Sequence, residues 1–160
     1  MKAVLAAAAL FVAAAAPAVA ATPALLQAVQ PWSRPAAAGG NGAGYMTLVN
    51  RGKTADALIG AESPAAQKVE MHASTMAGGV MKMSQELRVP LPAGGQVAFA
   101  PGGRHLMLIG LKKPLKTGDK APVTLHFASG EQLKVEFVVS PTPPAGAPSG
   151  HEMHDMQHMH

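Results

Sequence analysis

The chain has 160 residues, of which 13 are lysine or arginine, 9 are aspartate or glutamate, 7 are histidine and none is cysteine. A chain of this length has room for one domain with a hydrophobic core and is too short for two. The formal net charge of +4 is mild, and no helix-turn-helix, RNA-binding or zinc-finger pattern accompanies it, which excludes a typical nucleic-acid-binding protein. Because cysteine is absent, the fold has no disulfides and its stability comes from packing.

The first twenty residues have the features of a secretory signal peptide. Lys2 supplies a positive charge, an apolar run follows from Ala3 to Ala16, and Ala18-Val19-Ala20 forms a small-residue cleavage site. The apolar run is shorter than the ~20 residues that a membrane-spanning helix needs. We therefore predict a signal peptide over residues 1–20, a mature chain that begins at Ala21 with no membrane span, and a periplasmic location. The lack of a cysteine for lipid attachment favours a soluble periplasmic form.

Residues 22–140 have the pattern of one all-β domain. Short apolar or alternating runs are separated by turns rich in glycine and proline, and no convincing amphipathic helix interrupts them. The expected strands are Leu25–Val29, Gly44–Asn50, Ala57–Ala61, Gln67–His72, Val80–Leu87, Val97–Ala100, His105–Gly110, Val123–Phe127 and Leu133–Val139. In the last of them apolar residues recur at every second position, which is typical of a half-buried strand. This organisation predicts a β-sandwich or barrel.

The middle of this domain carries the candidate metal ligands. Two histidines and two methionines are separated by ten, twenty-one and one residues: His72, Met83, His105 and Met107. Two imidazoles and two thioethers make a soft, uncharged donor set, which among biological metals favours Cu(I). If His105 and Met107 lie on a strand, their side chains project from the same face and both reach one ion.

Each of these residues also has an ordinary structural interpretation, because methionine fills gaps in hydrophobic cores and a lone histidine is commonly a satisfied structural group. Met81 shares a face with Met83 in an extended chain, so either of the two methionines is a candidate ligand. Met71 and His72 point to opposite faces, so at most one of them is a ligand and the other packs inward. His126 lies outside the spacing pattern and is predicted to face solvent.

The composition changes abruptly after the last strand. Residues 141–150 contain four prolines together with glycine, alanine and serine, which is typical of a semi-rigid linker that builds no core. The last ten residues, 151–160, read HEMHDMQHMH and predict a disordered C-terminal tail that binds metal. Its histidines are expected to bind Cu(II) and its methionines to offer ligands to Cu(I). The seven candidate ligands are His151, Met153, His154, Met156, His158, Met159 and His160.

The spacing of the four ligands in the domain, together with the sequences GAGYMTLVNRG, VEMH, GGVMKM, PGGRHLMLIGLKKPLKTGD, VTLHF and VEFVV, resembles the PCu(A)C family of periplasmic copper chaperones. The resemblance covers about residues 22–140, the whole predicted domain. It implies a cupredoxin-like β-sandwich or barrel and a Cu(I) ion held by His72, Met83, His105 and Met107. It also implies a protein client, since this family delivers copper towards the dinuclear copper centre of cytochrome c oxidase.

We therefore predict a copper chaperone, which is a carrier and not an enzyme. A copper-buffering or resistance protein without a specific client is the alternative, because it shares every one of these sequence features. A redox enzyme or electron carrier is disfavoured, since a blue-copper site requires a cysteine thiolate and the chain has neither clustered carboxylates nor a Ser/His/Asp context. Four lysines after the ligands are interpreted as a solvated loop or as a basic patch that steers docking onto an acidic partner: Lys112, Lys113, Lys116 and Lys120.

Overall fold

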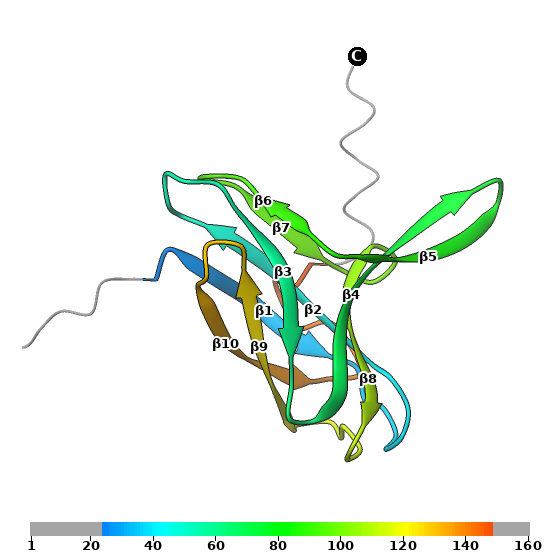
Figure 1. The fold of residues 1–160 in the computed structure, drawn as a ribbon. Helices are drawn as coiled ribbons and strands as arrows, with labels where there is room; N and C mark the ends of the chain where they lie inside the picture. The colour runs from blue at the N-terminus through cyan, green and yellow to red at the C-terminus, as the bar shows by residue number, and fades with distance from the viewer. Residues whose placement is uncertain (1–23, 149–160) are drawn as a thin grey trace, which may run out of the picture.

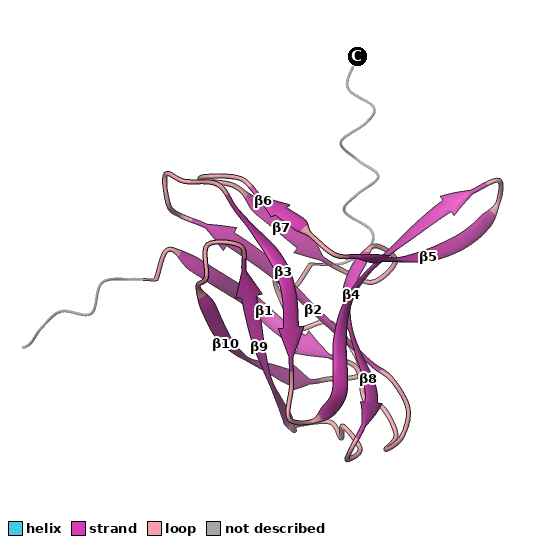
Figure 2. Ribbon diagram, in the orientation of Figure 1, coloured by secondary structure: helices cyan, strands magenta, loops and turns pink. Residues whose placement is uncertain are grey.

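The computed structural model describes residues 24–148, and these form ten β-strands with no helix among them (Figure 2). The strands are β1 (Leu26–Ser33), β2 (Gly42–Asn50), β3 (Asp56–Glu62), β4 (Ala66–Ala77), β5 (Val80–Glu86), β6 (Val89–Leu91), β7 (Gln96–Phe99), β8 (Arg104–Leu111), β9 (Lys120–Phe127) and β10 (Gln132–Val139). The predicted signal peptide and the predicted metal-binding tail lie outside the described residues. In the part of the chain that is described, no helix is long and apolar enough to cross a membrane.

Seven of the strands close into a barrel (Figure 1). In the order β4-β8-β2-β1-β10-β9-β3 each strand is hydrogen-bonded to the next, and β3 returns to β4 through the pair Ala61 and Val69. Neighbouring strands of this ring are antiparallel except β1 and β10, which run parallel. The other three strands extend the ring, with β5 on β4, β6 on β3 and β7 on β2. The predicted all-β, cupredoxin-like sandwich or barrel is confirmed.

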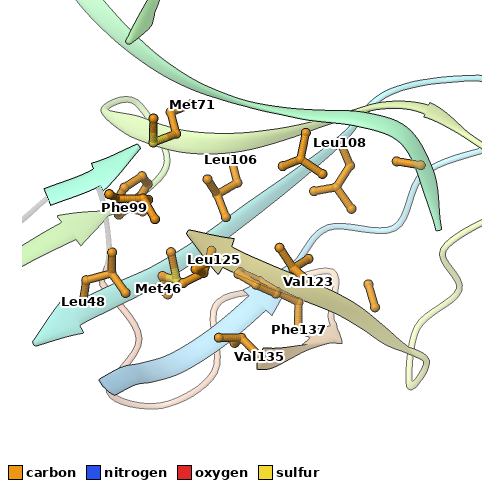
Figure 3. Packing of buried hydrophobic residues seen from close by; sticks show 14 of the residues in the cluster. Met46, Leu48, Met71, Phe99, Leu106, Leu108, Val123, Leu125, Val135 and Phe137 are labelled. Carbon is orange, nitrogen blue, oxygen red and sulfur yellow. The ribbon is translucent and has the colours of Figure 1, made fainter. Parts of the chain in front are cut away.

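Alternate residues of the barrel strands point inward and form one hydrophobic core (Figure 3). On β10 the buried residues Val135, Phe137 and Val139 recur at every second position, as the sequence pattern predicts. On β8 the inward residues include Leu106 and Leu108, which are fully buried. Because successive side chains of a strand point to opposite faces, the residues on either side of Leu106 project from the outer face of the barrel.

Strand β4 is longer than the sequence pattern predicts. The pattern ends the strand at His72, but the strand continues to Ala77 and pairs there with β5. The turn that joins them is Gly78-Gly79, with φ of 58° and 77°, a left-handed backbone that glycine adopts without strain in two-residue hairpins. Residues 75–77 of this extension and residues 80–85 of β5 are exposed, so burial imposes no apolar alternation that would reveal the extension. We call residues 75–83 the outer hairpin.

Strand β6 is also absent from the sequence prediction. It has only three residues, and Pro90 at its centre reads as a break in a strand pattern. In the structure Pro90 lies opposite Ala57 of β3, and β6 ends the order of strands in the sheet. Proline is tolerated on such an edge strand, because no further strand requires its missing N–H. Val89 and Leu91 add their buried side chains to the core.

Candidate metal centre

His72 and His105 lie directly opposite each other on the neighbouring strands β4 and β8. Their ring centroids are 5.8 Å apart and their planes are tilted by 46°. Directly opposite residues of an antiparallel pair project from the same face. Met71 precedes His72 on β4 and Leu106 follows His105 on β8, and both of these residues are buried in the core. The two imidazoles therefore meet on the outer face of the barrel although they are far apart in the sequence.

The environment of His105 keeps its imidazole neutral. The residue is buried, with 7% of its surface exposed. Burial lowers the pKa of the His105 imidazole; a hydrogen bond with the Gly103 backbone opposes this effect, and the neighbouring His72 adds to it. A neutral imidazole keeps a lone pair on one ring nitrogen, and that lone pair is what binds a metal ion. His105 is thus in the protonation state that a metal ligand requires at neutral pH.

Glu70 orients the second imidazole. Its Oε2 lies 2.8 Å from His72 Nε2, and hydrogen bonds from Lys68 and from His72 lower the pKa of the Glu70 carboxyl. An ionised carboxylate only accepts hydrogen bonds, so in the neutral imidazole Nε2 carries the proton and donates it, while Nδ1 keeps its lone pair. This Nδ1 is buried and has no hydrogen-bond partner in the described part of the chain. A free buried acceptor on an imidazole held by a carboxylate fits a metal ligand.

Met107 lies beside His105 on the same face. It follows His105 by two residues on β8, so the two side chains project together, and it lies opposite Glu70 on β4. The Met107 side chain is partly buried, while its neighbours Leu106 and Leu108 fill the core on the inner face. The strand placement predicted for the pair is confirmed, and thioether and imidazole are both presented outward.

Met83 approaches the histidines from β5. It lies opposite Ser74, which follows His72 by two residues on β4. The Ser74 N–H donates to the carbonyl of Gly103, the residue two before His105. Met83 is therefore a diagonal neighbour of His72 across the β4–β5 ladder, and such neighbours are about 7–8 Å apart, within reach of a long side chain. Met83 is 53% exposed, so it is the solvent-facing member of the four candidate ligands.

The other methionines of this region differ in the face they occupy. Met71 is 3% exposed and packs inward, as predicted, whereas His72 projects to the outer face. Met81 shares the outer face with Met83 but lies one step farther from the histidines, opposite Met76. By register, Met83 is therefore the nearer of the two alternative thioethers to the imidazoles.

An ion pair fixes β5 relative to β8. Arg104 Nε lies 2.7 Å from Glu86 Oε2, and Arg104 Nη2 lies 3.2 Å from Glu86 Oε1. Such a bidentate contact has a defined orientation as well as a favourable energy. Glu86 ends β5 and Arg104 precedes His105, so the contact spans β4 and holds the strand that carries Met83 in register with the strand that carries His105.

The sequence pattern does not single out Glu70. A signal is present, because Glu70 and His72 in the sequence VEMH stand at positions i and i+2 of an expected strand and so share a face. A glutamate on an exposed strand face is ordinary, however. The 2.8 Å contact and the free Nδ1 of His72 give it a role, and both depend on how β4 packs.

The remaining residues of interest do not join this centre. His126 on β9 is partly exposed, and its Nε2 lies 3.5 Å from Glu62 Oε1. Lys112 and Lys113 follow the far end of β8, about 23–26 Å along the strand direction from His105 at ~3.3 Å per residue. Lys120 pairs with Glu136 at 3.1 Å. The candidate ligands of the tail, residues 151–160, lie outside the described residues.

The lowered pKa of His105 predicts that the metal-free protein loses stability in acid. In the unfolded chain an imidazole takes up a proton near its ordinary pKa of about 6.5. In the folded protein the pKa of the His105 imidazole is lower, so His105 takes up its proton only at a lower pH. Between these two values the unfolded chain binds more protons, so the free energy of unfolding falls as the pH drops below about 6.5. Urea unfolding at about pH 7.5 and about pH 5.5 measures this fall. The variant His105→Gln is expected to have a shallower slope, and an unchanged slope would contradict the assignment.

The similarity of this chain to known proteins extends over the whole barrel. A family model described as "Putative lipoprotein LpqE-like" matches residues 26–139, from the first residue of β1 to the last of β10. The chain is 35% identical over 115 residues to "Putative lipoprotein Lxx21020" of Leifsonia xyli subsp. xyli, across 71% of this chain and 69% of that relative. The copper-bound PCuAC domain from PmoF2 is similar with a TM-score of 0.62 and 27% identity, covering 74% of this chain and 95% of that domain. The solution structure of CuI-DR1885 from Deinococcus radiodurans is similar with a TM-score of 0.53 and 31% identity, covering 77% and 85%.

Proposed function

Because this chain belongs to the LpqE-like family, the family of the PCuAC domains, we propose that it is a copper chaperone that binds Cu(I) and carries it without catalytic turnover. One observation supports this proposal above the others: two imidazoles and two thioethers share one outer face of the barrel. They belong to His72, Met83, His105 and Met107.

The chemistry of these donors suits Cu(I). Thioether sulfur and neutral imidazole are soft ligands that select copper over hard cations. None of them carries a charge, so the positive charge of the ion stays uncompensated and we expect easier release than from a thiolate site. The histidines bind from the buried side and Met83 from the exposed side. An acceptor would therefore reach the ion from the Met83 side and take it by ligand exchange.

We further propose that the chain works in the periplasm and delivers copper towards the dinuclear copper centre of cytochrome c oxidase. The predicted signal peptide supports export, and so does the lipoprotein name of the Leifsonia relative. The alternative is a buffering protein without a specific client. Mixing the Cu(I)-loaded chain with a metal-free oxidase fragment that carries this centre separates the two functions, since transfer supports delivery and retention supports buffering.

The tail has a separate proposed role, in which its histidines hold Cu(II) and its methionines offer ligands to Cu(I). The linker before it runs back towards the barrel: Ser140 N–H donates to the Ser33 carbonyl of β1, and Gly146 lies beside the Gln30 side chain. Counting bound copper before and after deletion of residues 151–160 tests this role. Retention of Cu(II) is expected to weaken below about pH 6, because imidazole must be deprotonated to bind.

X-ray absorption of the Cu(I)-loaded chain without residues 151–160 tests the centre itself. The method counts the sulfur and nitrogen neighbours of the metal, and deletion of the tail removes its competing donors. We expect two nitrogen and two sulfur neighbours. A copper ion with no sulfur neighbour, or a tail-less chain that does not bind Cu(I), would overturn the proposed function.

Glu70→Gln is expected to weaken Cu(I) binding while leaving all four ligands in place. The amide removes the negative charge that fixes the proton on His72 Nε2, and loss of such partners typically lowers metal affinity roughly 10- to 100-fold. Competition with a Cu(I) chelator measures the affinity, and nitrogen-15 shifts of the His72 ring report its tautomer. Glu62→Gln is the matched control, because Glu62 pairs with His126 outside the centre. Equal affinities of the two variants would show that Glu70 does not orient the ligand.

A further inference from the structure

The outer hairpin leaves the barrel next to the metal centre. The last ladder pair between β4 and β8 joins Ala73 to Arg104, and the Ser74 N–H still donates to the Gly103 carbonyl. Beyond Ser74, β5 is the only strand of the described chain that pairs with β4. Figure 1 shows this part of β4 and β5 extending away from the other strands. Both faces of the outer hairpin are therefore accessible to solvent and to another molecule.

One face of the outer hairpin carries three methionines and no other long side chain. Met76 and Met81 lie directly opposite each other, and Met83 follows Met81 by two residues on the same strand. This is also the face of His72, since residues two apart on a strand share a face. The alternate residues, among them Thr75 and Lys82, project from the opposite face. The three thioethers thus extend the donor face of the centre outward.

A role in the fold does not account for these methionines. Apolar side chains stabilise a protein when they leave water, but Met76, Met81 and Met83 remain 65%, 59% and 53% exposed. The core methionines Met46 and Met71 are 0% and 3% exposed. Threonine would serve an exposed strand at least as well, so the property that distinguishes this face is its sulfur.

The three sulfur atoms can reach a common point. Directly opposite residues of an antiparallel pair have Cβ atoms about 4.5–5.5 Å apart, and diagonal neighbours are about 7–8 Å apart. Methionine has three rotatable bonds and adapts its shape readily. Three neutral thioethers form a soft donor set, and such a set selects Cu(I) over hard divalent cations.

Building on the proposed function, we propose that Met76, Met81 and Met83 form a second, outer Cu(I) site that shares Met83 with the inner centre. The ion moves outward by ligand exchange: its bond to the Met83 sulfur persists, its bonds to ligands on β4 and β8 break, and bonds to the Met76 and Met81 sulfurs form. Copper stays Cu(I) throughout, and no electron or proton is transferred. The hairpin then offers the ion to an acceptor at its exposed end, away from the buried His105.

Titration of the full chain with Cu(I) under reducing conditions tests the outer site, if every methionine carries a carbon-13 methyl group. Each thioether then gives its own NMR signal, which single Met→Leu variants assign. We expect the Met83 and Met107 signals to move as the inner centre fills, and the Met76 and Met81 signals to move as well. The core methionine Met46 is the internal control and its signal is expected to stay in place.

The double variant Met76→Leu/Met81→Leu tests the transfer step while it keeps the apolar shape of the surface. We expect it to retain the affinity of the inner centre and to release Cu(I) to a small-molecule Cu(I) chelator several-fold more slowly than the unchanged chain. Val80→Leu is the matched control, because Val80 is exposed on the opposite face of the same hairpin, and its release rate should be unchanged.

The possible failures are distinguishable. If the Met83 and Met107 signals move but those of Met76 and Met81 do not, or if the double variant releases copper at the normal rate, the outer site is overturned and the inner centre stands. If none of the four signals moves, the proposed function fails with it. If the double variant slows transfer only to a protein acceptor, with the Met76 and Met81 signals unmoved, the hairpin is a docking surface and the outer site is again overturned.

Discussion

His105→Ala is expected to lose more Cu(I) affinity than any other single variant of the described residues. His105 is buried, its lowered pKa keeps it neutral, and it lies opposite His72 at 5.8 Å between ring centroids. Removal of a direct ligand should cost more than the roughly 10- to 100-fold loss that is typical when a partner of a ligand is removed. Competition with a Cu(I) chelator measures the affinity, on a chain without residues 151–160 so that the donors of the tail do not mask the loss.

His126→Ala is the matched control for this variant. His126 is an imidazole of the same barrel, partly exposed on β9 and paired with Glu62, and its removal should leave Cu(I) affinity unchanged. Thermal unfolding of both metal-free variants checks that each one folds. Equal Cu(I) affinities in the two folded variants would remove His105 from the centre.

Leu106→Ala is expected to have the largest effect on stability. Leu106 is fully buried between Met71 of β4 and Gly44 of β2, its partners across the sheet. An alanine leaves a cavity that the neighbours fill only in part, and such changes cost about 2–5 kcal/mol of unfolding free energy. A domain of this size has a total stability on the order of 5–15 kcal/mol, so the loss is a large fraction of it.

Urea unfolding of the metal-free protein measures this loss, with Leu87→Ala as the matched control. Leu87 follows β5 and is 76% exposed, so the same deletion of side-chain atoms there should change stability by no more than about 0.5 kcal/mol. A similar loss in both variants would show that Leu106 does not anchor the barrel.

These two predictions concern adjacent residues with opposite roles. His105 projects outward to the candidate centre, and Leu106 projects inward to the core. The alternation of side chains along β8 produces this division. The stability of the barrel and the position of a ligand therefore depend on one strand, and a cavity at Leu106 is expected to loosen the geometry at His105.

Much of the fold follows from local patterns that the sequence displays. The alternation from Leu133 to Val139 predicts β10, and the turn at Pro101-Gly102-Gly103 places His105 at the start of a strand. The structure confirms both elements. Local patterns do not predict the short strand β6, because Pro90 at its centre is read as a break in a strand.

The outer half of β4 escapes prediction for a different reason. The residues of the outer hairpin are exposed on both faces, so they do not show the alternation of apolar and polar residues by which a strand is recognised. The same exposure keeps Met76 out of a sequence-based list of ligands, since its position opposite Met81 becomes visible only when β4 is known to continue past His72.

The sequence by itself determined the kinds of donor this protein offers, their spacing along the chain and the face of the strand that each one occupies. These properties are local, because a side chain's face depends only on its position along its own strand. The tertiary structure decided which donors become neighbours: His72 beside His105, Met83 across from Ser74, and Glu70 on His72. The first contact joins parts of the chain that are far apart in the sequence, and it depends on the β4–β8 ladder and its register. The other two join residues that are close in the sequence. They still depend on the structure, because the exposed β4–β5 ladder sets the position of Met83 and the packing of β4 sets the contact between Glu70 and His72.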